Sequence, residues 1–139
     1  MSARSRFVSL AVLVAVASSA AGCSKDKEVA ATLAELQTFT SALMSSVKSA
    51  PTPQAGVAAG QKYLESHREP LRGKLAGLKE VRGFQVKDET KKRLETELVR
   101  HMTEVAGLQI EYATVSMSDP AFRQSLEKLV TDYKDLLVG

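Results

Sequence analysis

The chain has 139 residues, enough for one domain. It carries 19 Lys and Arg residues against 16 Asp and Glu residues, and removing Arg4 and Arg6 with an N-terminal leader leaves 17 against 16. This near balance, together with the absence of Trp, gives no electrostatic or stacking basis for binding nucleic acid. The single cysteine excludes an internal disulfide and a Cys-x-x-Cys redox or zinc motif.

The first 22 residues have the three-part order of a secretory signal peptide. A short positive segment, MSARSR, precedes an apolar run of 11 residues from Phe7 to Ala17, and the small residues SSAAG follow. A retained membrane-spanning helix is the alternative, but such a helix needs about 20 apolar residues. The 16 residues from Phe7 to Gly22 include four Ser or Gly residues. We therefore expect residues 1–22 to be removed.

The end of this leader resembles the lipobox of bacterial lipoproteins, in which small or aliphatic residues end in Gly-Cys. Here the sequence is Ala20-Ala21-Gly22-Cys23, and Ala20 stands where the family prefers Leu. The resemblance implies cleavage between Gly22 and Cys23, and lipid attachment to Cys23 through a thioether. The alternative is an ordinary signal peptide that ends near an unpaired thiol.

Residues 23–28 form a short tether between the cysteine and the expected domain, residues 29–139. Ser24 follows the cysteine, which by the same resemblance favours the outer membrane, with the domain facing the periplasm. Ser24 is also an expected helix cap, with Asp26 and Glu28 in the first turn near the positive end of the helix dipole. The expected partners are the lipid bilayer and an envelope protein.

Helical periodicity follows the tether. One apolar stripe has steps of four and three residues, and consists of Val29, Leu33, Leu36, Thr40, Leu43 and Val47. After the proline-containing residues 48–56, a second stripe is interrupted at Pro70, where the helix either kinks or starts anew. This stripe consists of Val57, Gly60, Leu64, Leu71, Leu75 and Leu78.

A third helix is predicted over residues 88–115, with Asp88 as its N-cap. Its apolar face consists of Leu94, Leu98, His101 or Met102, Val105, Leu108, Tyr112 and Val115. Asp119 or Ser118 is expected to cap a last helix with Pro120 in its first turn. The last apolar stripe consists of Phe122, Leu126, Leu129, Tyr133 and Leu136. The pattern predicts an all-α fold, an antiparallel helical bundle of three to four helices.

Few residues are candidates for chemistry. Glu97, His101 and Glu104 are spaced to share one helix face, and could bind a metal weakly. A buried haem would need a methionine opposite a histidine; the candidates are Met44, Met102, Met117, His67 and His101. Methionine at core spacing is usually packing. We expect His101 to lie at the edge of the apolar stripe, with its ring reaching water or Glu97.

Other local patterns have structural interpretations. Two Gly-x-x-x-Gly pairs, Gly56/Gly60 and Gly73/Gly77, would let helices approach closely. Lys91 is expected to pair with Glu95, and Arg93 with Glu97, on a solvated face. The expected function is therefore that of a membrane-anchored envelope lipoprotein with a structural or protein-interaction role, without catalytic activity, metal or cofactor. The alternative is a periplasmic bundle that binds haem, metal or an apolar molecule.

Overall fold

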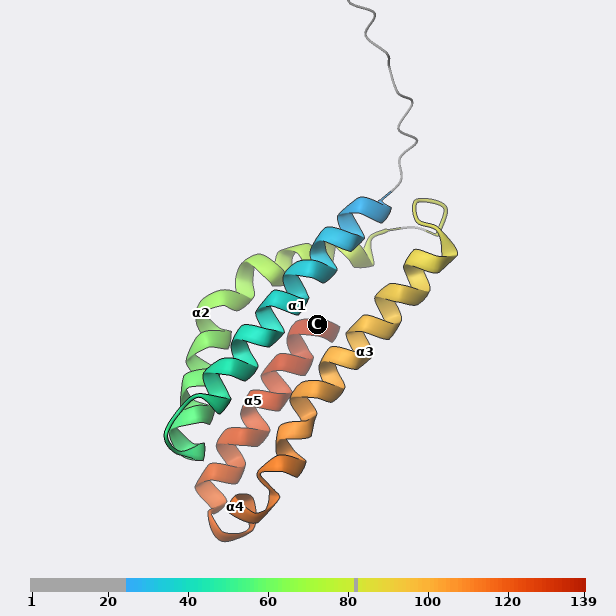
Figure 1. The fold of residues 1–139 in the computed structure, drawn as a ribbon. Helices are drawn as coiled ribbons and strands as arrows, with labels where there is room; N and C mark the ends of the chain where they lie inside the picture. The colour runs from blue at the N-terminus through green and yellow to red at the C-terminus, as the bar shows by residue number, and fades with distance from the viewer. Residues whose placement is uncertain (1–24, 82) are drawn as a thin grey trace, which may run out of the picture.

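The computed structural model describes residues 25–81 and 83–139, and Figure 1 shows their arrangement. Its helices are α1 (Asp26–Lys48), α2 (Pro53–Lys79), α3 (Asp88–Glu111), α4 (Ala113–Ser118) and α5 (Pro120–Val138). Within the described residues there is no strand. The predicted all-α bundle is confirmed, with four long helices and one short one.

The four long helices surround one core, and helices that follow one another in the chain run in opposite directions (Figure 1). Helix α1 packs against α2 and α3, and α5 packs against the same two helices. Helices α1 and α5 therefore face each other across the core, as do α2 and α3. The connection from α2 to α3, of which residues 80, 81 and 83–87 are described, crosses one end of the bundle (Figure 1).

The expected apolar stripes supply most of the core. The side chains of Leu36, Leu43, Leu64 and Leu108 have no exposed surface, and all belong to the stripes predicted from the sequence. Each such leucine contributes about 1.5–3 kcal/mol through burial. The periodicity thus gave the inward face of each long helix.

One hydrogen bond joins opposite helices within the core. The Thr40 hydroxyl donates to the Leu36 carbonyl oxygen at 2.8 Å, and lies 2.5 Å from the Tyr133 hydroxyl. With the proton of Thr40 already committed, Tyr133 is the donor to Thr40. Burial raises the pKa of Tyr133 to about 12, so this phenol stays protonated and can donate at neutral pH.

Helix α2 continues through Pro70, so the predicted interruption there is not a break between two helices. The helix runs from Pro53 to Lys79 with Pro70 inside it, and Figure 1 shows α2 bending along its length. Proline has no N–H, so the hydrogen bond to the carbonyl of Ser66 is missing. Packing of Leu64 and Leu71, one on each side of Pro70, holds both parts of α2 on the same core.

The helix starts are partly as predicted. Asp119 caps α5 by accepting from the Phe122 N–H at 3.0 Å, which confirms the prediction, and Pro120 occupies the first turn. Asp88 is not an N-cap as predicted, because Lys87 holds that position in extended backbone and Asp88 lies in the first turn. Its carboxylate there faces the positive end of the helix dipole.

The third predicted helix is divided near its end. Tyr112 has φ −100° and ψ 17°, and separates α3 from the six residues of α4. Its ring packs edge-on against Phe122, with ring centroids 5.7 Å apart. This contact joins the end of α3 to the first turn of α5, and places α4 against α5 at that end of the bundle.

The bundle has two ends of different construction. We call the end bounded by residues 49–52 and α4 the closed half, and the end bounded by the start of α1 and the connection from α2 to α3 the open half (Figure 1). Four long helices surround the closed half. The chain terminus of α5 stops short of the other end of the bundle, so α5 leaves part of the open half uncovered (Figure 1). All fully buried residues of α3, namely His101, Val105 and Leu108, lie beyond its midpoint, whereas Leu94 and Leu98 are only half-buried.

The two glycine pairs lie on different faces of α2, the first pair on the buried face and the second on the exposed face. A Cβ atom on Gly56 would lie 2.1 Å from the Val47 carbonyl oxygen, and one on Gly60 would lie 2.5 Å from Val47 Cγ2. At Gly73 and Gly77 a Cβ atom would meet nothing within 4 Å. The expectation of close helix approach is confirmed for the first pair and is wrong for the second.

Candidate functional site

His101 lies in the core and not at its edge. Its side chain has no exposed surface, so the expectation that the ring reaches water is wrong. The expected neighbour Glu97 is close, with its carboxylate 3.7 Å from Nε2. His101 is buried because it lies in the part of α3 that both α1 and α5 cover, beyond the open half.

Arg100 covers this histidine from the solvent side. Its Nη2 lies 2.9 Å from His101 Nε2 and 2.8 Å from Glu97 Oε2, and the same nitrogen donates to Gln37 on α1. Nη2 has only two hydrogens for these three neighbours, and His101 Nδ1 has no hydrogen-bond partner among the described residues. Burial, reinforced by the positive charge of Arg100, lowers the pKa of His101 below its usual value.

The carboxylates of Glu97 and Glu104 do not form an open metal site with His101. Arg100 already pairs with Glu97 at 2.8 Å and with Glu104 at 3.5 Å. The hydrogen bond from Arg100 lowers the pKa of Glu97, which keeps this carboxylate charged. No group of three or more His, Cys, Asp or Glu residues within the described ranges is placed to hold a metal ion.

The candidate haem ligands are distributed over different environments. Met117 on α4 is 86% exposed, Met44 and Met102 are half-buried against the core, and His67 is exposed on α2. His101 is the one buried histidine of the two, and the Arg100 guanidinium lies 2.9 Å from its Nε2. Axial ligation through this nitrogen would therefore require Arg100 to move away.

The ion pairs on α3 differ from those predicted. Lys91 pairs with Asp88 at 3.1 Å and not with Glu95, and Glu97 pairs with Arg100. Both observed pairs are separated by three residues instead of four. Such exposed pairs contribute about 0–1 kcal/mol each, so the exchange has little effect on stability.

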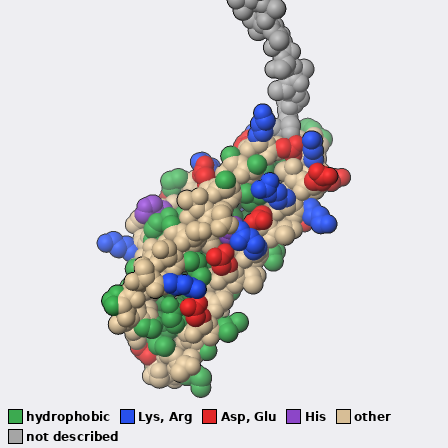
Figure 2. Space-filling view, in the orientation of Figure 1, with side chains coloured by type: hydrophobic (Ala, Val, Ile, Leu, Met, Phe, Trp, Pro, Cys, Tyr) green, Lys and Arg blue, Asp and Glu red, His purple; other side chains and the backbone are tan. Residues whose placement is uncertain are grey.

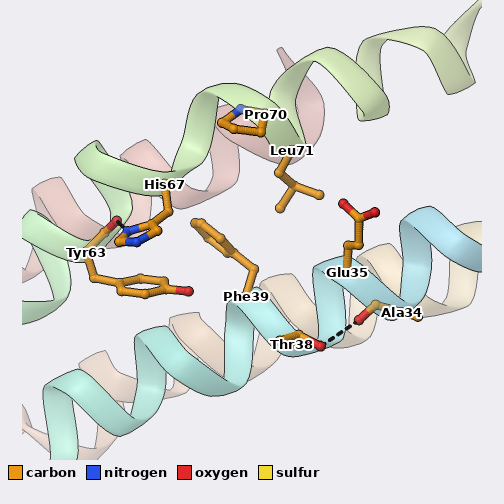
Figure 3. A pocket seen from close by; sticks show the side chains of 8 residues that line it. All are labelled: Ala34, Glu35, Thr38, Phe39, Tyr63, His67, Pro70 and Leu71. Carbon is orange, nitrogen blue, oxygen red and sulfur yellow. Dashed lines mark hydrogen bonds between the residues drawn. The ribbon is translucent and has the colours of Figure 1, made fainter.

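A groove of about 440 Å³ lies between α1 and α2, beside the proline in α2. Figure 3 shows Phe39 pointing from α1 toward α2, with Tyr63 and His67 on one side and Leu71 on the other. The rings of Phe39 and Tyr63 are 5.3 Å apart, and those of Tyr63 and His67 stack at 4.3 Å. Three aromatic rings, one from α1 and two from α2, therefore line an open surface groove.

The polar groups of the groove are held in place. His67 Nδ1 donates to the Tyr63 carbonyl oxygen at 2.9 Å (Figure 3), so Nε2 is the nitrogen left to accept a hydrogen bond. Lys74 pairs with Glu35 at 2.6 Å across the two helices. Sequence analysis did not identify this groove. The i,i+4 spacing of Tyr63 and His67 was the available signal, but the position of Phe39 opposite them depends on tertiary packing.

A second feature lies at the end of the open half. The backbone N–H of Lys25 donates to the Gln85 carbonyl oxygen at 2.8 Å, and the backbone N–H of Lys87 donates to Asp26 Oδ1 at 3.0 Å. Residues 85–87 are thereby held against the start of α1. Phe84, just before them, is 82% exposed. As expected, Asp26 and Glu28 lie in the first turn of α1.

The predicted cleavage junction, Gly22 and Cys23, lies outside the described residues, as does the predicted cap Ser24. Among residues 25–81 and 83–139, no helix has the length and apolar character needed to cross a membrane. The described part of the chain defines an all-α four-helix bundle. Comparisons with protein families, with characterised proteins and with solved structures find no match.

Proposed function

We propose that this chain is a bacterial envelope lipoprotein, anchored to the membrane through acylated Cys23, whose helical bundle has a structural or protein-interaction role. The observation that carries the proposal is the short distance in sequence between the lipobox-like cysteine and the first helix. A lipobox-like sequence ends at Cys23, and α1 begins at Asp26. With so few residues between them, the bundle is held at the bilayer surface instead of at the end of a long linker.

Because the core is filled by side chains, an interaction role at the surface is better supported than the binding of a ligand inside the bundle. Leucine, valine and tyrosine side chains without exposed surface occupy the centre of the closed half. The groove between α1 and α2 is open to solvent, and a partner could reach its aromatic rings without entering the core. Ser24 supports placement in the outer membrane, facing the periplasm.

Replacing the cysteine tests the anchor. In the bacterium that makes the protein, Cys23→Ser should abolish incorporation of labelled palmitate and release the domain from the membrane fraction. Ser24→Ala is the matched control, because it changes the neighbouring residue and leaves the thiol; it should keep both the label and the membrane location. Unchanged labelling and membrane retention in Cys23→Ser would refute the proposal.

The aromatic groove favours one alternative, the binding of a small apolar molecule at the surface. Purifying the full chain from membranes distinguishes this alternative from an interaction role. Under our proposal, the protein has no visible absorption band, no stoichiometric metal and no co-purified ligand, and it cross-links to a defined envelope protein. A stoichiometric ligand lost in Phe39→Ala would favour the alternative.

A further inference from the structure

The loop of residues 83–87 is fixed to the start of α1, where the tether enters the bundle. The two hydrogen bonds described above join Lys25 to Gln85 and Asp26 to Lys87. Both bonds therefore involve the first two described residues of the chain. Val86 packs against the core, which holds the loop from below. The loop therefore has a defined position relative to the start of α1.

The length of the tether places this loop beside Cys23. Consecutive Cα atoms are 3.8 Å apart, so the two peptide units from Cys23 to Lys25 span at most about 8 Å. An acyl group on Cys23 that enters a bilayer must therefore bring Lys25, and the loop bonded to it, to the level of the lipid headgroups.

Phe84 is the large apolar side chain that this loop presents. It is 82% exposed, and it lies in the turn between Gly83 and Gln85. A single exposed apolar residue is ordinary on a protein surface. Phe84 differs from an ordinary exposed residue because it lies next to the proposed anchor and therefore next to the bilayer. Aromatic side chains favour the interface between hydrocarbon and water.

The charges around this end are mixed in sign. Lys25 pairs with Glu28 at 2.6 Å and Lys91 pairs with Asp88 at 3.1 Å, and Figure 2 shows blue and red side chains interspersed near the start of α1. Such a surface has no strong preference for anionic lipid. Contact with a bilayer would therefore depend on the aromatic ring and the acyl chains, and not on a basic patch.

We propose that the Phe84 loop is a membrane-contact surface, in which the ring of Phe84 inserts into the interface of the bilayer that holds the Cys23 acyl chains. This inference rests on the proposed function. The loop and the anchor together give two points of attachment, so the bundle is held in one orientation. The open half then faces the lipid, and α4 and the turn of residues 49–52 face away from it (Figure 1).

Tryptophan fluorescence tests this contact, because the chain contains no Trp and a single substitution gives the only indole emission. The full lipidated chain carrying Phe84→Trp is reconstituted into phosphatidylcholine vesicles with brominated acyl chains. We expect a blue-shifted emission peak and strong quenching. The matched control is Met117→Trp, at a position 86% exposed at the opposite end, which should keep water-like, unquenched emission.

The experiment distinguishes failure of the membrane contact from failure of the lipid anchor. If both variants float with the vesicles but Phe84→Trp gives the same unquenched emission as Met117→Trp, the membrane contact is refuted while the anchor stands. If wild-type chain lacks palmitate label and does not float, the proposed function itself fails. Far-ultraviolet circular dichroism of both variants, matched to wild type, verifies that the bundle is folded in each comparison.

Discussion

The closed and open halves of the bundle use the same kinds of residue with different results. In the closed half, Leu108 has no exposed surface and Gly56 lies against the backbone of Val47. In the open half, Leu94 is only half-buried and a Cβ atom on Gly73 would meet open space. The two leucines differ in how fully the neighbouring helices cover them, whereas Gly73 differs from Gly56 because it lies on the exposed face of α2.

The difference between the two leucines has a physical origin in helix length. Helix α5 has 19 residues, whereas α2 has 27 and α3 has 24, so α5 cannot cover the full length of its neighbours. How deeply a side chain is buried depends on which helices extend to its position along the bundle axis. The closed half therefore has the larger share of the stabilising apolar burial, and the open half is free to carry a surface function.

Truncation of matched leucines should show the largest difference between the halves. Leu108→Ala should lower the free energy of unfolding by about 3–5 kcal/mol, because it leaves a cavity among four helices. Leu94→Ala, the matched change in the open half, should cost less, about 1 kcal/mol, since part of its surface is already in water. Denaturant unfolding measures both. Equal losses would contradict the distinction between the halves.

Matched glycine substitutions should differ in sign. Gly56→Ala should destabilise the protein by about 1–3 kcal/mol, because the added methyl group meets the Val47 carbonyl and the two helices must separate. Gly73→Ala should stabilise it by about 0.5–1 kcal/mol through the higher helix propensity of alanine. Thermal unfolding gives the direction of each change. A stabilising Gly56→Ala would show that α1 and α2 do not touch as described.

The pH dependence of stability should report on His101, which lies at the boundary between the two halves. The pKa of His101 is lowered in the folded protein, so the unfolded chain takes up a proton at a higher pH than the folded one does. Stability from the neutral ring is present above the unfolded pKa of about 6.5, and is lost as the pH falls below it. We expect the melting temperature to decrease between about pH 7 and pH 5, above the range in which most carboxylates titrate.

Removing each histidine in turn identifies the source of this dependence. His101→Gln should flatten the decrease, at a cost in stability at neutral pH of about 1–3 kcal/mol, because a buried polar group must be repacked. His67→Gln is the matched control, since its ring lies outside the core, and should keep the wild-type decrease. A decrease that persists in His101→Gln would assign it to other groups.

The sequence predicted the inward face of each long helix correctly, because apolar periodicity is a local property. The stripe from Val29 to Val47 and the cap at Asp119 are examples. Errors came from positions where the outcome depends on distant residues. His101 sits at the edge of its own stripe in sequence, but α1, α5 and the Arg100 side chain enclose it. At Pro70 the sequence left open a kinked helix or a new one, and the structure has the kinked helix, because packing of Leu64 and Leu71 holds α2 together across the proline.

The candidate sites divide in a similar way. The proposed lipid attachment at Cys23 was identified from a short local motif, and it lies outside the described residues. The groove needs Phe39 of α1 opposite Tyr63 and His67 of α2, and the loop at Phe84 needs Lys25 bonded to Gln85. These pairs are 24 to 60 residues apart in the chain, so no sequence window contains them.

The bonds between the start of α1 and residues 85–87 have a mechanical consequence. A pull applied through the N-terminus would not act on the first turn of α1 alone, because the Lys25 N–H and the Asp26 carboxylate pass the load to the connection between α2 and α3. Three helices would share the force before α1 could fray. The bundle would resist being peeled open from its tethered end, where a lone helix terminus would yield first.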